Sequence, residues 1–227
     1  MKICDIKVGD ILRFGKYDWF KADEFGAFIP VHSIGRYPYG YTRRENDETV
    51  YVYVLNEWLN STAEEFDLTE HHALGYSGVH AFRHHKSGFL CEFEPEELDA
   101  LTGSVTLMHD IDIRGGNKLP LFNKMGVRIK NECGEYEPYW LERTTDTYSA
   151  PCVGRDGQIQ IRYWSQFPVP VRPIIHIDQN LRVERCEDVT TVYSRKPKKA
   201  YEINFNSDRV ETLTYTEEDF ASLFELA

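Results

Sequence analysis

The sequence predicts an α+β fold that is mainly antiparallel β, with a few helices and a C-terminal β-hairpin followed by a helix. Aromatic residues make up 14% of the 227 residues, and such residues are enriched in strands. Short apolar runs are separated by glycine turns such as Gly9-Asp10 and Gly154-Arg155-Asp156-Gly157. Only a few stretches place apolar residues at helical spacing. These observations predict many short strands joined by tight turns.

The N-terminal half is predicted to contain a β-meander, a loop and short helices. Residues 4–32 alternate apolar and polar positions around glycine turns, which is typical of a meander. Residues 33–50 are rich in tyrosine, glycine and arginine and are expected to form a loop. Apolar spacing predicts a helix over 52–66, with Ser61 as a possible second N-cap. Glu94 to Leu101 predicts a short acidic helix with Pro95 in its first turn.

The C-terminal half is predicted to be mostly β. Apolar runs predict strands at 104–108, 127–130, 139–143, 150–153, 158–164 and 171–177. We expect one domain over 1–186 and an appendage over 187–227. The appendage is predicted to be a hairpin around the basic residues Arg195 to Lys199, followed by a helix that begins near Thr216.

The negative charge of the chain is typical of a soluble protein, and it also suits docking onto a basic protein partner. It carries 37 acidic and 26 basic residues, a formal net charge of -11. Such a surface as a whole repels phosphates, so we expect no direct nucleic-acid binding; it suits a basic, nucleic-acid-binding protein instead. The five cysteines form no CxxC pair, and neither a leader nor a membrane-length apolar run is visible. These features predict free thiols, no membrane association and a cytoplasmic location.

Five short motifs carry a resemblance to a known family. In order they are Phe14 to Trp19, Leu55 to Asn60, Tyr139 to Arg143, Asp156-Gly157 and Val171-Arg172-Pro173, within roughly residues 8–182. This order resembles an uncharacterised domain family of Gram-positive bacteria and their phages, with fG.Y.W, WLN, WLRS and GVRP-type motifs. The family is similar to the C-type-lectin-like fold of formylglycine-generating enzymes and phage receptor-binding domains. The resemblance implies a C-type-lectin-like core, and for a phage protein the host cytoplasm as its location.

The chain departs from the family motifs at several positions, and the resemblance implies no activity. Thr144 stands in place of a serine, Pro170 stands in place of a glycine, and the histidine-rich segment has no counterpart. The family has no established function to carry over. What the resemblance implies therefore concerns the fold.

Four residues of these motifs are expected to be structural. Trp19, Trp58 and Trp140 each lie in an apolar pattern, which predicts core positions. Arg172 is predicted to be buried and paired with a carboxylate or with carbonyls at the end of a strand.

The histidine-rich segment is the first candidate for chemistry. Five histidines lie between His71 and His85. On a helix, His80 and His84 would share one face with His85 beside them, which suits zinc, and Glu92 or Glu94 would add a carboxylate. The glycines in the segment argue against a helix, so the alternative is a polar surface loop with exposed histidines.

Other catalytic and metal patterns are weaker. Asp110, Asp112 and Asn117 are a candidate calcium loop, but Arg114 interrupts the EF-hand spacing and a solvated turn is the alternative. Cys152 and Cys186 form no recognisable catalytic pair. Because no phosphate loop, nucleophile elbow or dinucleotide fingerprint is present, we expect no cofactor, and a protein without enzymatic activity is favoured.

An aromatic and basic segment is the candidate binding surface. It contains Tyr37, Tyr39, Tyr41, Arg43 and Arg44, and tyrosine and arginine dominate binding hot spots. The alternative is that the tyrosines pack against the domain.

The sequence therefore favours a non-catalytic protein-binding module, encoded by a phage or mobile element. The more specific hypothesis is that the protein is an acidic inhibitor of a host nucleic-acid-binding defence complex, similar in kind to an anti-CRISPR protein. Two alternatives stay open: a virion receptor-binding or lectin-like domain, and a metal-dependent enzyme that uses the cluster from His71 to His85.

Overall fold

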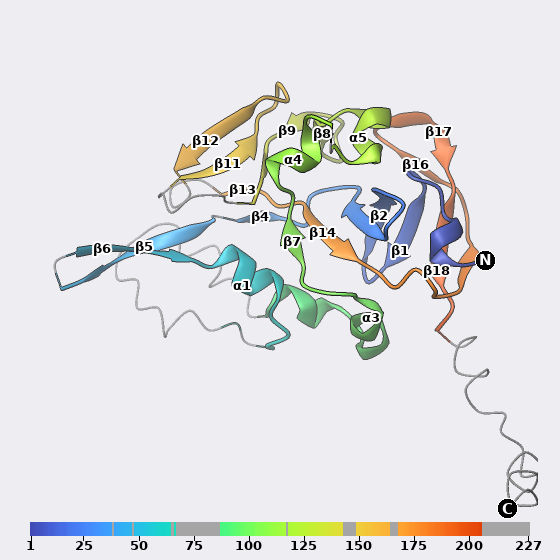
Figure 1. The fold of residues 1–227 in the computed structure, drawn as a ribbon, viewed down its shortest axis with the longest axis horizontal. Coiled ribbons are helices and arrows are strands. Elements are labelled where there is room, and N and C mark those ends of the chain that lie inside the picture. Colours follow the sequence, from blue (N-terminus) through green and yellow to red (C-terminus); the bar gives the residue numbers. More distant parts are fainter. Residues whose placement is uncertain are drawn as a thin grey trace, which may run out of the picture.

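A seven-stranded sheet forms the centre of the fold (Figure 1). The computed structural model describes residues 1–37, 39–46, 48–64, 66, 87–116, 118–142, 149–163 and 168–205. In spatial order the strands are β15 (Val183–Arg185), β18 (Ala200–Ile203), β1 (Ile11–Phe14), β2 (Tyr17–Lys21), β3 (Ala27–Pro30), β14 (Pro173–His176) and β7 (Thr106–Leu107).

Strand pairing in this sheet is antiparallel with one exception. Strands β1 and β18 run parallel, with Ile11 opposite Ala200. The other neighbours in the sheet pair antiparallel. The structure therefore confirms the prediction of a mainly antiparallel α+β fold.

The tight turn between β1 and β2 depends on a glycine. Phe14 pairs with Tyr17, so Gly15 and Lys16 form a two-residue loop. Gly15 has a φ of 58°, which glycine adopts without the cost that other residues incur. A Cβ at this position would also lie 2.8 Å from the ring of Phe93. The turn therefore requires glycine on two counts.

The main sheet separates two hydrophobic cores. Successive side chains of a strand point to opposite faces, so Leu12 and Trp19 enter one core while Ile11 and Phe20 enter the other. Helices α1 (Leu55–Leu59) and α3 (Pro95–Ala100), with the 3-10 helix η3 (Phe89–Glu92), contribute to the first core. Helices α4 (Asp110–Ile113) and α5 (Pro120–Met125) contribute to the second and lie on the other side in Figure 1.

Smaller sheets surround this centre. One has three strands, β10 (Tyr139–Trp140), β11 (Ser149–Val153) and β12 (Ile159–Tyr163). The two-stranded ones are β4 (Arg36–Tyr37) with β13 (Val169–Pro170), β5 (Gly40–Glu45) with β6 (Glu48–Tyr53), β8 (Ile129–Lys130) with β9 (Tyr136–Glu137), and β16 (Val189–Thr191) with β17 (Ser194–Lys198). A 3-10 helix, η1 (Ile3–Asp5), precedes β1.

Three local predictions differ from the structure. Residues 33–50 were expected to form a loop but contribute β4, β5 and part of β6. The helix expected over 52–66 is limited to α1, because 48–53 pairs with β5 as a strand. In the expected hairpin, Thr191 pairs with Ser194, so the basic residues lie on β17 and not in the turn.

The boundary expected after residue 186 does not divide the fold. Strand β18 lies between β1 and β15 inside the main sheet, and its hydrogen-bonding edges are used on both sides. Residues 187–205 are therefore part of the central domain. The helix expected from Thr216 lies outside the described residues.

Candidate functional site

A pocket of about 550 Å³ opens beside β4 and β13. This volume is in the range of small-ligand sites, roughly 300–1,000 Å³. Its lining combines basic, amide and proline side chains: Arg36, Pro138, Arg155, Asp156, Gln160, Pro168, Val169 and Pro170.

Backbone pairing and prolines fix two walls of the pocket. Pro170 lies opposite Arg36, and Val169 lies opposite Tyr37, in the short β4–β13 ladder. Proline has a fixed φ, so Pro138 and Pro170 hold their parts of the lining with little backbone freedom.

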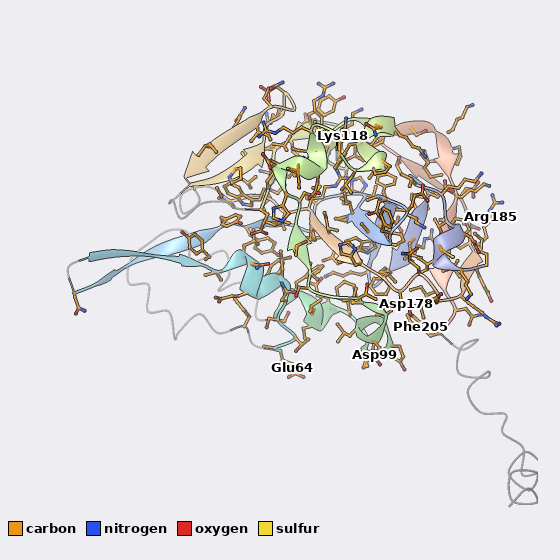
Figure 2. The ribbon with its side chains drawn as sticks, viewed as in Figure 1. Glu64, Asp99, Lys118, Asp178, Arg185 and Phe205 are labelled. Carbon is orange, nitrogen blue, oxygen red and sulfur yellow. The ribbon has the colours of Figure 1, made fainter. Side chains whose placement is uncertain are left out.

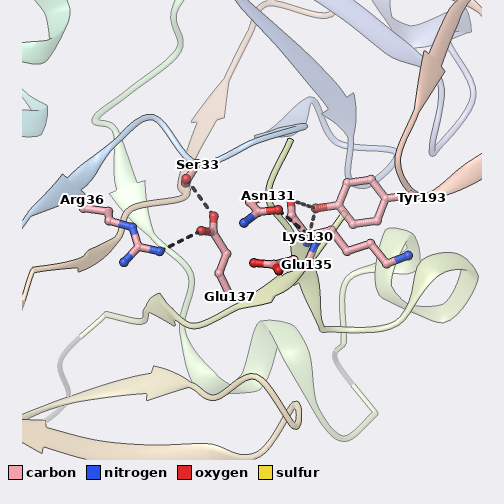
Figure 3. Close-up of polar contacts among 7 residues, drawn as sticks. All are labelled: Ser33, Arg36, Lys130, Asn131, Glu135, Glu137 and Tyr193. Atoms are coloured by element: carbon pink, nitrogen blue, oxygen red, sulfur yellow. Dashed lines mark hydrogen bonds and ion pairs between the residues drawn. The ribbon is translucent and has the colours of Figure 1, made fainter. Parts of the chain in front are cut away.

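Arg36 is held in place by a buried carboxylate. An Arg36 NH2 group donates to Glu137 Oε2 over 3.3 Å, and the Ser33 hydroxyl donates to Glu137 Oε1 over 2.9 Å (Figure 3). The Glu137 side chain is 5% exposed whereas that of Arg36 is 55% exposed. Each carboxylate oxygen of Glu137 therefore accepts one of these hydrogen bonds. The buried Glu137 holds the more exposed Arg36 side chain at the pocket rim.

Arg155 is presented by the turn between β11 and β12. The Gly154 amide donates to the Gln158 carbonyl over 2.8 Å, and the Asp156 carboxylate accepts from the Gln158 amide over 3.0 Å. A Cβ on Gly154 would lie 2.4 Å from the Gln160 amide nitrogen and 2.7 Å from the Asp156 carboxylate, so a side chain there would displace both groups. Among the described residues, no carboxylate pairs with Arg155, and its guanidinium remains available to a ligand.

Arg172 follows the lining residue Pro170 by two positions and is fully buried. Its Nε donates to the carbonyl of Pro30, the last residue of β3, over 2.8 Å. Its two terminal nitrogens have no hydrogen-bond partner within the part of the chain that the structure describes. The guanidinium lies 5.9 Å from the centre of the Tyr193 ring, and burial lowers its pKa. Arg172 thus meets a strand-end carbonyl, one of its two expected partners, and forms no ion pair with a described carboxylate.

The three tryptophans expected in the core are buried, each with its indole N–H bonded to a carbonyl. Trp19 donates to Phe14 over 2.9 Å. Trp140 donates to Tyr37 over 2.7 Å.

Trp58 donates to Ser87 over 3.0 Å. These bonds satisfy the polar atom of each large apolar side chain and connect strands to neighbouring segments.

The five residues of the expected aromatic and basic binding surface do not share one described surface. Tyr37 and Tyr39 are 4% exposed and belong to the first core, so they do not present the contact surface that was predicted. Their apolar rings pack on Trp58 and Trp140, with ring centres 4.3 and 5.6 Å apart. Tyr41, Arg43 and Arg44 lie on β5, but their side chains are not among those that the structure describes.

The candidate metal ligands are not brought together in the described residues. His71, His72, His80, His84 and His85 lie outside them, as does Asn117. No group of three or more histidine, cysteine, aspartate or glutamate side chains in the described ranges is arranged to hold a metal ion.

The carboxylates of those predictions have local roles. Glu92 accepts from the Tyr17 hydroxyl over 2.5 Å and pairs with Lys16 over 2.9 Å. Asp110 pairs with Arg114 over 2.6 Å, and Asp112 accepts from the His109 amide at the start of α4.

The sequence shows no recognisable catalytic pair in Cys152 and Cys186. Cys152 is buried and Cys186 is half-buried, and the structure places neither in a disulfide with another described cysteine. Among the described residues, no helix has the length and apolar character needed to cross a membrane.

Sequence reasoning did not identify Arg36, Glu137 or Arg155 as site residues. Glu137 carried the only available signal. It is two positions before Tyr139, which is buried in the second core, so Glu137 would face inward if the strand predicted at 139–143 extended to it. A charged residue at such a position requires a partner.

Comparisons with known proteins leave the site without a precedent. No family model matches the chain, and no curated protein and no solved structure matches it.

Proposed function

We propose that this chain is a non-catalytic binding protein whose pocket beside Arg36 and Arg155 receives an anionic group of a protein partner. One observation carries the proposal: two guanidiniums line one pocket, the first fixed by a buried carboxylate and the second without an ion pair to any described carboxylate. A pre-positioned arginine loses little side-chain freedom on binding, and a planar guanidinium matches a carboxylate with two parallel hydrogen bonds.

The lining supports binding in preference to catalysis. Among the described residues of its lining there is no histidine, cysteine, serine or lysine, and Asp156 is the single carboxylate. The Asp156 side chain accepts from the backbone of its own turn. The lining therefore supplies recognition by charge and shape, without an activated nucleophile or an acid–base pair.

Titration calorimetry with small anions tests this site. Glutarate, an acetylated glutamate peptide and inorganic phosphate would be titrated into the wild type, Arg155→Gln and Arg36→Gln. We expect the carboxylates to bind and each variant to lose at least about tenfold in affinity, since charge-assisted hydrogen bonds contribute about 1.5–3 kcal/mol.

Arg114→Gln is the matched control, because Arg114 is an exposed arginine whose described partner is Asp110, outside the pocket lining. It should bind like the wild type. Absence of binding by every probe, or an equal loss in Arg114→Gln, would count against the pocket as the site.

A second candidate is the acidic inhibitor of a nucleic-acid-binding defence complex. Its supporting observation is a run of carboxylates from the end of η3 through α3, namely Glu92, Glu94, Glu96, Glu97 and Asp99. Figure 2 shows Asp99 at the same lower edge as Glu64. A surface of one sign attracts a basic groove and gives association that weakens with salt.

Binding to a purified CRISPR effector at increasing ionic strength tests this candidate. We expect affinity to fall with salt, and to fall at low salt in Glu94→Gln with Asp99→Asn, two exposed positions. Affinity independent of ionic strength would rule out a charge-driven groove mimic.

We also propose that the core is a variant of the C-type-lectin-like fold of the Gram-positive and phage family. The support is Val171-Arg172-Pro173, where the first two residues are fully buried and the third begins β14. A virion receptor-binding role predicts a trimer or larger assembly that binds cell-surface glycans, whereas an inhibitor co-purifies with an intracellular partner. Sedimentation and glycan arrays separate these roles.

A further inference from the structure

Basic side chains gather where α5 approaches β17, although the chain is acidic overall. Lys7, Lys124 and Lys199 are exposed and Lys198 is half-buried. A Cβ on Gly9 would lie 3.9 Å from both Lys198 Nζ and Lys124 Cδ, so these two side chains converge on one loop. The cluster draws on three separate segments of the chain.

The carboxylate of Asp10 lies among these lysines. Burial raises the pKa of the Asp10 carboxyl, and the positive charges of four surrounding lysines, Lys199, Lys198, Lys7 and Lys124, oppose that rise. One acidic group therefore faces four basic ones, and the cluster retains a local positive charge.

A second group of cations surrounds an exposed aromatic ring nearby. The Arg128 guanidinium lies 4.1 Å from the centre of the Tyr136 ring, and Lys130 Nζ lies 5.3 Å from it. Tyr136 is 36% exposed. With Tyr193, these residues line a cavity of about 150 Å³.

The two groups form one surface, which we call the basic face: Lys7, Lys124, Arg128, Lys130, Lys198 and Lys199, with Tyr136. Lys124 and Met125 are consecutive in α5, and Met125 lines the cavity beside Tyr136. Lys130 Nζ donates to the Val192 carbonyl over 3.4 Å, and the Tyr193 hydroxyl bonds both backbone groups of Lys130 (Figure 3). These bonds connect β8 to the hairpin that carries Lys198.

The net charge of -11 does not remove the local field of this face. At physiological salt, charges farther apart than about 8 Å are largely screened, so acids at distant edges contribute little. Counter-charges at this face include Asp10 within the cluster, and Glu132 and Glu135 follow Lys130 in the β8–β9 turn.

We propose that the basic face binds single-stranded nucleic acid, with its lysines on phosphates and a base stacked beside Tyr136. Lysines recognise phosphates as point charges, whatever the sequence. An exposed tyrosine with an adjoining guanidinium supplies the π surface on which unpaired bases stack. An acidic peptide would use the lysines but has no base for the aromatic ring, and a duplex hides its base faces.

Fluorescence anisotropy of a short labelled DNA strand, measured at several salt concentrations, tests the proposal. For four phosphate contacts on a single strand, we expect the logarithm of the binding constant to fall with a slope of about -3 against the logarithm of salt. Lys198→Gln and Lys199→Gln should each weaken binding and reduce the slope by about 0.7. Tyr136→Ala should weaken binding by about fivefold or more, while Tyr136→Phe retains it.

Lys16→Gln is the control for charge, because Lys16 pairs with Glu92 on the other side of the main sheet and contributes nothing to the basic face. Circular dichroism establishes that each variant is folded. The proposal is wrong if no binding is seen, if Lys16→Gln loses as much as Lys198→Gln, or if Tyr136→Ala binds like the wild type. Competition by oligoglutamate or by duplex DNA as strong as that by a single strand of equal charge would also overturn the choice of partner.

Discussion

The carboxylate of Glu137 and the guanidinium of Arg36 form an ion pair, 3.3 Å between Oε2 and NH2, that joins the protein interior to the pocket rim. The two residues are 101 positions apart in the chain. Only the carboxylate is buried, so the desolvation cost of the pair falls mainly on Glu137, and Ser33 offsets part of it with a second hydrogen bond.

We expect Glu137→Gln to destabilise the protein and to weaken anion binding in the pocket. The amide retains the shape of the side chain but loses the charge that holds Arg36, which costs about 1–3 kcal/mol of unfolding free energy. Urea denaturation measures the first effect and calorimetry the second. Glu135→Gln, an exposed neighbour, should change neither; a Glu137→Gln protein as stable as the wild type would contradict the role assigned to this pair.

Arg172 should tolerate methionine better than alanine. Its Nε has one hydrogen bond and its terminal nitrogens have none in the described part of the chain, so an apolar side chain of similar length removes a buried charge at little cost. Alanine leaves a cavity, and we expect Arg172→Ala to be about 2–5 kcal/mol less stable than Arg172→Met.

Thermal and urea unfolding of both Arg172 variants check this comparison. Equal destabilisation by methionine and alanine would show that the charge itself is needed for folding. If Arg172→Ala folded normally and lost only binding, Arg172 would be a functional residue and not a structural one.

Stability should fall in alkaline solution because of Tyr37. Burial, with the nearby charge of Glu92, raises the pKa of Tyr37 to about 12, whereas an unfolded tyrosine ionises near 10. Between these values the folded phenol keeps a proton that the unfolded chain releases. The stabilisation is therefore complete below about pH 10 and is lost as the pH rises towards 12.

Urea unfolding across this pH range should show a shallower decline for Tyr37→Phe than for the wild type. An identical slope for Tyr37→Phe and the wild type would exclude Tyr37 as a source of the effect.

Gly88 should not tolerate a side chain. A Cβ there would lie 2.2 Å from the Ser61 carbonyl oxygen, so Gly88→Ala forces the two segments apart and should cost about 1–3 kcal/mol. Gly116→Ala provides a control, because no atom of the residues that the structure describes lies within 4 Å of the corresponding Cβ. Comparable unfolding midpoints for the two variants would argue against the close contact between Gly88 and Ser61.

Local patterns indicated the strands and the core but not the long-range pairing. The segment around Trp19 and Phe20 was predicted to belong to a β-meander with Trp19 in the core, and the structure buries the two residues on opposite faces of one strand. Nothing local indicated that Ala200 pairs with Ile11, because strand pairing across most of the chain depends on tertiary packing. Residues near the C-terminal end therefore looked like an appendage.

The pocket could not be predicted for the same reason. Arg36, Glu137 and Arg155 come from three separate strands or turns, and each has an ordinary sequence context. Tyr37 and Tyr39 show the opposite error: their residue type favoured a binding surface, but the burial of large rings beside Trp58 and Trp140 decided their position.

The parallel pairing of β1 with β18 also constrains how the protein folds during its synthesis. Strand β1 leaves the ribosome well before β18, so one of its two hydrogen-bonding edges stays unpaired until Ala200–Ile203 has been made. Closing so long a loop is slow, and an unpaired apolar edge is prone to intermolecular pairing in the meantime. A truncation that removes 200–203 should therefore yield an aggregating chain rather than a smaller folded one.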